Sequence, residues 1–292
     1  MYPNKFDYYR PASLAEAVEV MARYGHDARP LAGGQSLIPL MKLRLANPAV
    51  IVDLNAVPGL SYVRQENDRL AFGALTCHCD VEDSELIRAH YAAIGDAVSH
   101  IGDAQVRNLG TVGGSLVHSD PSGDWGPVLL ALGGEMRCLG PSGNRLIQAS
   151  EFFTEMYETA RQPDEIVTEV RIASPGPRAG GAYLKLERRS GDFAVVGVAV
   201  YLALDEHDEC TEAGIGLSGV APTYVKATTA ERLLRGNRLS EATIAEAARS
   251  LDAAMDPYSD VRAPAEYKRA MAKVFFQKAL ELARQRATAQ RS

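Results

Sequence analysis

The fold of this chain depends first on Leu31-Ala32-Gly33-Gly34-Gln35-Ser36, which an apolar segment, residues 37–45, follows directly. Two glycines and a hydroxyl before a helix-like run can bring backbone N–H groups and a helix N-terminus close to an anion. The apolar spacing predicts a helix over 37–45 that carries Leu37, Leu40, Met41 and Leu45 on one face, with Ser36 as its N-cap residue. We therefore expect residues 31–36 to form one half of a clamp that holds a pyrophosphate.

A second glycine turn, Gly110-Thr111-Val112-Gly113-Gly114-Ser115, offers the same chemistry further along the chain. Taken alone, each turn is more typical of a tight bend that needs positive φ at glycine. The two together favour a long ligand with two phosphates. On this reading, valine at Gly33 or Gly113 should release the ligand and leave the chain folded.

Composition bounds the class of protein. The 292 residues are 46% hydrophobic and 23% charged, which is typical of a soluble globular chain with two or three compact units. A formal net charge of −6 argues against general affinity for nucleic acid. The N-terminus lacks the features of a secretory signal, and no long apolar run predicts an integral membrane segment. We expect a cytoplasmic protein that meets a membrane, if at all, only through partners.

Hydrophobic periodicity divides the chain into three units. Residues 1–55 combine a helix capped at Ser13, the first glycine turn and a buried strand near 50–54. Residues 56–175 contain several strands, among them a hairpin turned at 141–144, and a helix predicted near 80–90 that begins with an acidic turn. The segment 174–177, Ser-Pro-Gly-Pro, is the best candidate linker.

The third unit, residues 178–292, reads as a meander followed by helices. Strands are predicted at 182–187, 195–204 and 210–217, and helices at 227–235, 240–255 and 265–286. Because strands and helices are segregated rather than alternating, the sequence predicts an α+β fold.

Two motifs invite wrong conclusions. Residues 214–219 match the dinucleotide pattern G-x-G-x-x-G, but they run on into Val220-Ala221-Pro222 instead of opening a helix, so we reject a Rossmann site. Cys77-His78-Cys79 lacks a second ligand pair at metal-site spacing, which favours free thiols.

Several polar residues remain open to two interpretations. Ser115, His118 and Asp120 could serve a hydrolase or a metal, but they share one local segment, which favours a solvated loop. The carboxylate of Asp124 suits the hydroxyls of a ribose. Lys185 belongs either to a plain basic edge with Arg188 and Arg189 or to a site where a cation faces a flavin ring.

These residues carry a resemblance to a known family. The two glycine turns, together with Ile101-Gly102-Asp103-Ala104-Gln105-Val106-Arg107-Asn108-Leu109, resemble the medium, FAD-binding subunit of molybdenum hydroxylases, as in the carbon monoxide dehydrogenase and xanthine dehydrogenase family. The likeness also covers residues 6–11, 185–192 and 264–268. Gln35 departs from the histidine that is usual in the carbon monoxide enzymes, and residues 115–120 differ as well.

The resemblance implies a fold, a cofactor and partners. The expected fold is a two-subdomain FAD-binding domain of the vanillyl-alcohol-oxidase (PCMH) type, 1–55 and 56–175, plus a C-terminal domain, 178–292, with a three-stranded antiparallel sheet and a helical bundle. FAD is expected in this chain. The molybdopterin cofactor and two [2Fe-2S] clusters are expected in a large and a small partner subunit, assembled as a dimer of heterotrimers.

Site residues follow by the same resemblance. Asp124 is expected toward the adenosine half of FAD, and Lys185 and Phe193 near the isoalloxazine. The remaining expected contacts are Leu31, Ala32, Gly33, Gly34, Gln35, Ser36, Ile101, Gly102, Gln105, Gly110, Thr111, Gly113, Gly114 and Ser115.

The function implied is electron transfer. Electrons from the partner's clusters would reach FAD and leave to an external acceptor, so no catalytic triad is required in this chain. Two alternatives stay open: a stand-alone FAD-dependent oxidase or dehydrogenase of the same fold, and a non-catalytic scaffold.

Overall fold

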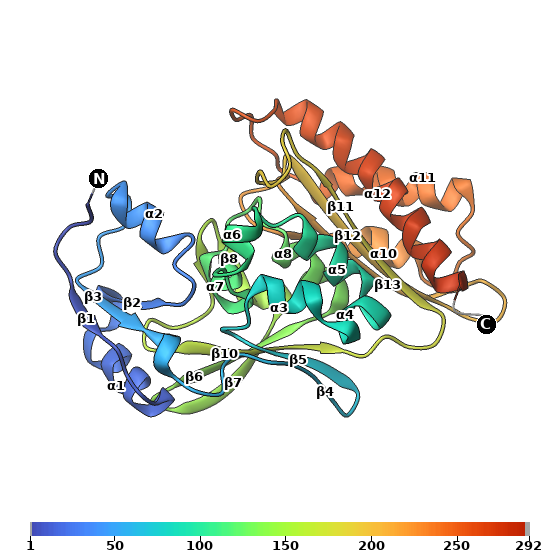
Figure 1. Cartoon of the computed structure of the whole chain (residues 1–292). Helices are drawn as coiled ribbons and strands as arrows, with labels where there is room; N and C mark the ends of the chain where they lie inside the picture. Colours follow the sequence, from blue (N-terminus) through green and yellow to red (C-terminus); the bar gives the residue numbers. More distant parts are fainter. Residues whose placement is uncertain (1, 290–292) are drawn as a thin grey trace.

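A computed structural model describes residues 2–289, and its first unit is a small parallel sheet beside two helices (Figure 1). Helix α1 begins where the Ser13 hydroxyl accepts a hydrogen bond from the N–H of Glu16 at 3.2 Å, as the sequence predicts. The sheet has the order β1-β3-β2, with β3 buried at its centre. The elements are β1 (Asp7–Tyr9), α1 (Leu14–Tyr24), η1 (Gly25–Asp27), β2 (Ala28–Leu31), α2 (Leu37–Lys42), β3 (Val50–Asp53) and η2 (Leu54–Ala56).

Helix α2 corrects the sequence prediction in two ways. It ends at Lys42 because Arg44 takes a left-handed conformation with φ of 62°, so Leu45 leaves the helix and is 73% exposed. Ser36 makes no side-chain capping bond. Of the predicted apolar face only Met41 is fully buried, because little of the protein covers this short helix.

The second sheet is antiparallel, with the order β4-β5-β10-β6-β7. The predicted hairpin is confirmed, since β6 pairs with β7 across the turn at 140–143. A helix expected near 80–90 is divided at Ser84, whose extended backbone ends α3 and whose hydroxyl caps α4. The elements are β4 (Val63–Glu66), β5 (Arg69–Gly73), α3 (His78–Asp83), α4 (Glu85–His90), α5 (Ala92–Ser99), α6 (Ala104–Arg107), α7 (Val112–His118), α8 (Trp125–Leu132), β6 (Glu135–Gly140), β7 (Gly143–Gln148), α9 (Ala149–Phe152), β8 (Phe153–Glu155), β9 (Glu158–Thr159) and β10 (Ile166–Ala173).

The C-terminal sheet has four strands rather than three. The additional strand β14 pairs Val225 with Leu217, and at two residues it is too short to produce a periodic sequence signal. The elements are β11 (Ala179–Leu186), β12 (Val196–Leu204), β13 (Cys210–Ser218), β14 (Val225–Lys226), α10 (Thr228–Leu234), α11 (Glu241–Ser250), η3 (Leu251–Ala253) and α12 (Ala265–Ala289). The α+β class and the meander-then-helices order are confirmed.

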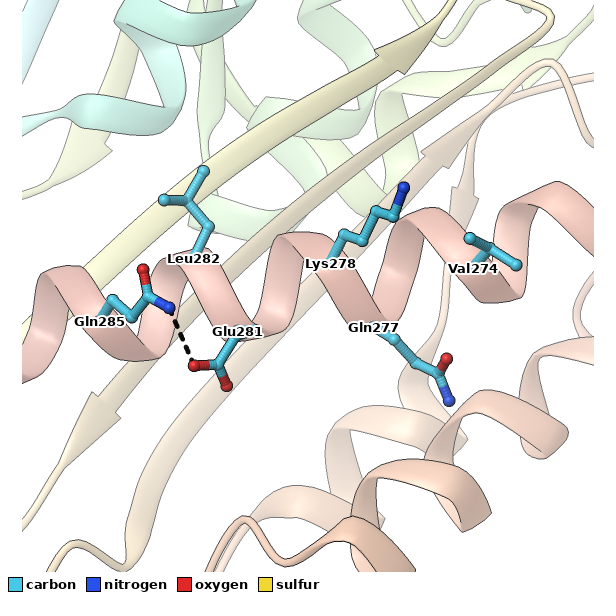
Figure 2. A pocket seen from close by; sticks show the side chains of 6 residues that line it. All are labelled: Val274, Gln277, Lys278, Glu281, Leu282 and Gln285. Atoms are coloured by element: carbon cyan, nitrogen blue, oxygen red, sulfur yellow. Dashed lines mark hydrogen bonds between the residues drawn. The ribbon is translucent and has the colours of Figure 1, made fainter.

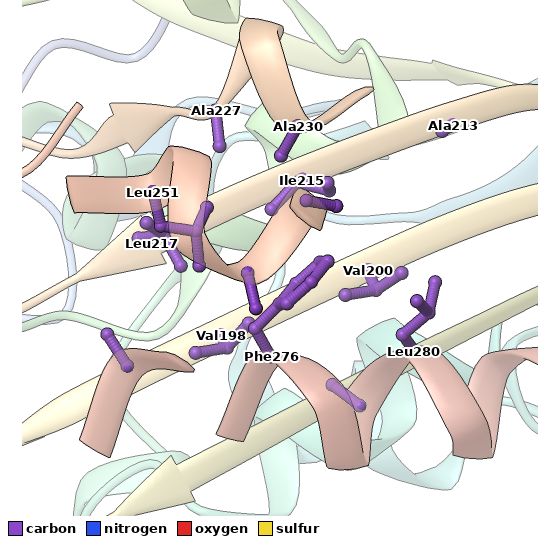
Figure 3. Close-up of a cluster of buried hydrophobic side chains, with 14 of the residues drawn as sticks. Val198, Val200, Ala213, Ile215, Leu217, Ala227, Ala230, Leu251, Phe276 and Leu280 are labelled. Atoms are coloured by element: carbon purple, nitrogen blue, oxygen red, sulfur yellow. The ribbon is translucent and has the colours of Figure 1, made fainter. Parts of the chain in front are cut away.

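Helices cover both faces of this sheet (Figure 1). On one face, Val198, Ile215 and Leu217 pack against Phe276 and Leu280 of α12 to form an apolar core (Figure 3). Because successive side chains of a strand point to opposite faces of the sheet, every second side chain of these strands lies in this core.

The opposite face of the sheet receives α8 from the second unit. A Cβ atom on Gly214 would lie 1.8 Å from the Ala131 carbonyl oxygen, and one on Gly216 would lie 2.0 Å from that of Pro127. Two glycines of the G-x-G-x-x-G match thus allow a helix to approach a strand closely. The rejection of a Rossmann turn agrees with this geometry, since the motif lies within and just after β13.

Among residues 2–289, no helix is both long and apolar enough to cross a lipid bilayer.

Candidate cofactor site

The two glycine turns, which we call loop one (residues 31–36) and loop two (residues 110–115), lie against each other. A Cβ atom on Gly33 would be 1.8 Å from the Leu109 carbonyl oxygen and 2.9 Å from the Cα of Gly110. A Cβ atom on Gly114 would be 3.7 Å from the Cβ of Ala32. Residues predicted as one site from two distant stretches are thus brought together.

Loop one carries unused hydrogen-bond donors. Within the described chain, the N–H groups of Gly34, Gln35 and Ser36 donate to no protein acceptor, and they lie just before α2. The Gln35 side chain donates from Nε2 to the Gly33 carbonyl at 3.1 Å, which stiffens the turn. Because Ser36 makes no capping bond, its hydroxyl is also available. Such a group of free donors is suited to an anion.

Loop two commits its amides to acceptors within the protein. The N–H of Val112 donates to Thr76 O at 3.0 Å, that of Gly113 to Ala74 O at 2.9 Å, and that of Gly114 to Thr111 Oγ1 at 3.1 Å. Thr111 is therefore the N-cap residue of α7. The half-buried Ser115 hydroxyl has no hydrogen-bond partner among the described residues, so it is the group of loop two that a ligand can still use.

This geometry contradicts the expectation that valine at Gly33 or Gly113 would leave the chain folded. Gly33 faces the Leu109 carbonyl, and a Cβ atom on Gly113 would lie 2.6 Å from the Cβ of Ala74 and 2.7 Å from its carbonyl oxygen. Both glycines are needed for contacts of the chain with itself. A close approach between two backbones cannot be distinguished in sequence from an approach to phosphate.

Ile101, Gly102 and Gln105 lie in the segment that leads into loop two. Gly102 has φ of 51°, and its carbonyl oxygen would be 2.5 Å from a Cβ atom on Gly191 of the C-terminal unit. Ile101 and Gly102 are half-buried, whereas Gln105 is exposed on α6. The C-terminal unit therefore contacts the segment that leads into loop two.

Asp124 and Lys185 form a buried pair that the sequence did not predict. Tyr183 donates from its hydroxyl to Asp124 Oδ1 at 2.6 Å, and Lys185 Nζ lies 3.2 Å from the same carboxylate. Lys185 also donates to the His100 carbonyl at 3.0 Å and lies 3.4 Å from Glu187. Burial raises the pKa of Asp124, and the charge of Lys185 opposes that rise.

This pair joins the second unit to strand β11. The partners are about sixty residues apart in sequence, and each residue alone reads as a free polar group. Phe193, by contrast, stays 46% exposed at the turn before β12.

His78 is a structural residue that sequence reasoning missed. Its Nδ1 accepts a hydrogen bond from Trp125 Nε1 at 3.2 Å, and its backbone N–H donates to the Gly110 carbonyl at 3.0 Å. Burial lowers the pKa of His78 to about 4. The imidazole is thus held neutral as a support for loop two. The thiols of Cys77 and Cys79 are half-buried on either side, and in residues 2–289 no group of three or more His, Cys, Asp or Glu side chains is placed to hold a metal.

The segment after loop two is tied to a neighbouring hairpin. Tyr157 donates from its hydroxyl to Asp120 at 3.2 Å, and the His118 ring lies 5.2 Å from the Tyr157 ring. Burial lowers the pKa of His118. Since Ser115 and His118 share no hydrogen bond in the described structure, the arrangement lacks the nucleophile–base contact of a hydrolase.

An open hollow elsewhere on the surface does not compete as a site. All six of its lining residues belong to α12: Val274, Gln277, Lys278, Glu281, Leu282 and Gln285 (Figure 2). Gln285 donates to Glu281 at 3.0 Å, so these polar groups pair with each other. With a single helix as its wall, the hollow lacks the convergent groups of a ligand site.

Comparison with known proteins adds to this geometry. Residues 4–175 match the family described as "FAD binding domain in molybdopterin dehydrogenase", and residues 181–283 match "CO dehydrogenase flavoprotein C-terminal domain". The carbon monoxide dehydrogenase medium chain of Afipia carboxidovorans is 39% identical over 98% of this chain and 99% of its own length. Subunit alpha of the 6-hydroxypseudooxynicotine dehydrogenase complex of Paenarthrobacter nicotinovorans is 34% identical over 98% of this chain and 97% of its own.

A solved structure gives the same result. Reconstituted CO dehydrogenase from Oligotropha carboxidovorans contains a chain that superimposes with a TM-score of 0.95 at 39% identity, covering 98% of this chain and 100% of that one. The expected family, fold class and flavin cofactor are therefore confirmed. The chain belongs to the carbon monoxide dehydrogenase-like flavoproteins, the FAD-binding medium subunits of molybdenum hydroxylases, and is an oxidoreductase subunit.

Proposed function

We propose that this chain receives electrons from [2Fe-2S] clusters of a small partner subunit, collects them on FAD and passes them to an external acceptor. Substrate would be oxidised at a molybdopterin cofactor in a large partner subunit. The names of the relatives, a medium chain and a subunit of a dehydrogenase complex, support a role within an assembly. We further propose that this assembly is a dimer of heterotrimers.

The contact between loops one and two carries the proposal. Loop one offers free N–H groups at Gly34, Gln35 and Ser36, and loop two, which contacts loop one at Gly33, offers the Ser115 hydroxyl. A diphosphate has several acceptor oxygens, and this donor set fits them. The residues that would hold the pyrophosphate are Leu31, Ala32, Gly33, Gly34, Gln35, Ser36, Gly110, Thr111, Gly113, Gly114 and Ser115, with Ile101, Gly102 and Gln105 along the edge.

The two loops would contribute differently. Loop one supplies backbone donors and the Ser36 hydroxyl, whereas in loop two the Gly113 and Gly114 amides stay bound to protein. Loop two therefore sets the position of loop one through Gly33 and offers mainly Ser115 to the ligand.

Asp124 and Lys185 are expected at opposite ends of FAD, but their direct contact does not fit that expectation. We propose that this buried pair lies beside one part of the cofactor and that Phe193 lies near the isoalloxazine. Since Tyr183 and Lys185 already occupy both sides of the Asp124 carboxylate, we expect this pair to fix the wall of the site. Bound FAD supplies the two-electron chemistry, and the protein binds it, orients it and limits its exposure.

The substrate of the complex is not assigned. Two relatives of similar identity are named for carbon monoxide and for 6-hydroxypseudooxynicotine, so likeness in this chain does not select a substrate. Its pocket would lie in the large subunit.

Co-expression with the partner subunits tests the proposal. We expect the purified chain to show a flavin absorption spectrum and its flavin to be reduced by substrate only when both partner subunits are present. The matched control is the complex assembled without the large subunit, in which flavin should stay oxidised. A flavin-free chain, or reduction by substrate in the isolated chain, would contradict the proposal; the second result would favour a stand-alone oxidase.

A further inference from the structure

An arginine from the loop before α12 lies against the exposed ring of Phe193. The Arg262 guanidinium carbon is 5.6 Å from the ring centroid, at a distance where a cation is attracted to an aromatic face. Arg188 donates from Nη1 to the Val261 carbonyl at 3.0 Å, so a second cation joins the same two segments. Residues 258–263, which we call the brace, are thus attached to the turn that carries Phe193.

The brace is itself firmly held. Asp260 Oδ1 accepts from the N–H groups of Arg262 at 2.8 Å and Ala263 at 3.0 Å, which closes a tight turn. Asp260 Oδ2 accepts from Lys268 Nζ at 2.8 Å, and Lys268 is 2% exposed within α12. The Lys268 ammonium also lies 4.7 Å from the Tyr258 ring centroid. Arg262 therefore starts from an anchored backbone, which lowers the entropy lost when its side chain contacts Phe193.

The turn that carries Phe193 faces the cofactor-binding units. Two residues before the ring, Gly191 touches the Gly102 carbonyl. One residue after it, the N–H of Ala194 donates to the Ser122 carbonyl at 3.1 Å. The backbone at Phe193 is consequently fixed on both sides, while its side chain is about half exposed and is contacted by Arg262.

We propose that Arg262 is a positioning residue that holds the Phe193 ring over the mouth of the FAD site, and so limits how easily small molecules reach the bound flavin. This inference rests on the proposed function, because it requires FAD in this chain with its isoalloxazine beside Phe193. Without the cation, the side chain of Phe193 gains rotamer freedom, and the ring spends less time in the covering orientation.

Acrylamide quenching of flavin fluorescence tests this role in the FAD-loaded complex. Acrylamide is neutral, so removing a charge does not attract or repel it. We expect Arg262→Gln to raise the quenching constant about two- to fivefold, with FAD content and thermal unfolding unchanged. Arg262→Lys, which keeps the cation, should stay closer to the unaltered protein. The matched control is Arg232→Gln on α10, an exposed arginine that donates to Thr229 and should change nothing.

A double variant separates positioning from a general loosening of the loop. Phe193→Ala alone should raise the quenching constant, and Arg262→Gln added to Phe193→Ala should raise it no further. A quenching constant unaffected by Arg262→Gln but raised by Phe193→Ala would overturn the inference. The inference would also be overturned if Arg262→Gln still raised the quenching constant in the Phe193→Ala protein. If unaltered protein carries no flavin, the proposed function fails first, and that result is seen in the absorption spectrum before any quenching is measured.

Discussion

Loops one and two are nearly interchangeable as sequence but opposite as structure. Both combine two adjacent glycines with a serine, and the sequence predicts that both bind phosphate in the same way. In the structure, loop one leaves the N–H groups of Gly34, Gln35 and Ser36 free, whereas loop two commits those of Val112, Gly113 and Gly114 to protein acceptors. The lesson is that glycine can serve either a ligand or a neighbouring backbone.

The difference follows from what surrounds each loop. Loop two is enclosed by β5, α3 and α8, so its amides meet the carbonyls of Ala74 and Thr76. Loop one borders the sparsely covered helix α2 and has no such carbonyls within reach among the described residues. Loop two therefore supports the site, and loop one provides the binding surface.

Separating the two loops should give the largest effect. Gly33→Ala would place a Cβ atom 1.8 Å from the Leu109 carbonyl oxygen, so we expect the free energy of unfolding to fall by about 3 kcal/mol or more, with loss of bound FAD. The measurement is thermal unfolding together with flavin content. Gly95→Ala in α5, where a Cβ atom meets open space, is the control and should be neutral or slightly stabilising. A Gly33→Ala protein as stable as the control would refute the contact between the loops.

Removing the cation of the Asp124–Lys185 pair should have the next largest effect on stability. Lys185→Met leaves the Asp124 carboxylate buried without its cation, and we expect a loss of about 3–5 kcal/mol in the free energy of unfolding. Urea unfolding measures it. Arg284→Met, which removes an exposed ion pair with Glu281 on α12, should change stability little. Equal effects of the two variants would show that the Asp124–Lys185 pair is not a buried support.

Acid should disturb loop two through His78. Its pKa is about 4 in the folded chain against 6.5 for an ordinary histidine, so the unfolded chain binds the proton more strongly. The contribution to stability is therefore fully present above pH 6.5 and is lost as the pH falls toward 4, by as much as about 3 kcal/mol.

Comparing variants isolates this contribution. His78→Asn keeps an acceptor for Trp125 and removes the titration, so the difference between unfolding temperatures at pH 7.5 and pH 5 should shrink. His207→Asn, at an exposed histidine, should retain the full pH dependence. An unchanged pH dependence in His78→Asn would exclude His78 as its source.

The smallest expected effects should distinguish a residue that binds FAD from a residue that supports the fold of the site. Ser36→Ala removes a hydroxyl with no capping bond, so we expect FAD affinity to fall about tenfold while the apo chain keeps its stability. Thr111→Ala removes the N-cap of α7, so we expect about 1 kcal/mol lower stability and a smaller change in FAD affinity. Flavin titration and thermal unfolding of both variants give the test. Were the two variants to exchange these outcomes, the assigned roles of the loops would be reversed.

Much of the fold could be predicted because local signals agreed with it. The hairpin between β6 and β7 has turn residues between two strand patterns, and β11 to β13 have long apolar runs. Local signals failed where the backbone changed direction without a glycine. Arg44 at φ of 62° ends α2 early, and Ser84 divides one expected helix into two.

The candidate site could be predicted in its position but not in its hydrogen bonding. Glycine pairs identify both loops, yet which amides remain free depends on Ala74 and Thr76, which lie in another part of the chain. The same limit hides the pairing of Asp124 with Lys185. The brace on Phe193 is also a long-range contact, since Arg262 lies far along the chain.

The packing of α8 has a consequence for evolution and for engineering. This helix lies over the five-stranded sheet and also inserts against Gly214 and Gly216 of β13, so Tyr183, Ala199 and Tyr224 share a core with the second unit. The two family matches adjoin between residues 175 and 181, but the side chains that pack the two units together lie in other parts of the sequence. Recombination between relatives at that boundary would exchange a sheet without the helix fitted to it, and a successful chimera would have to inherit α8 together with β13.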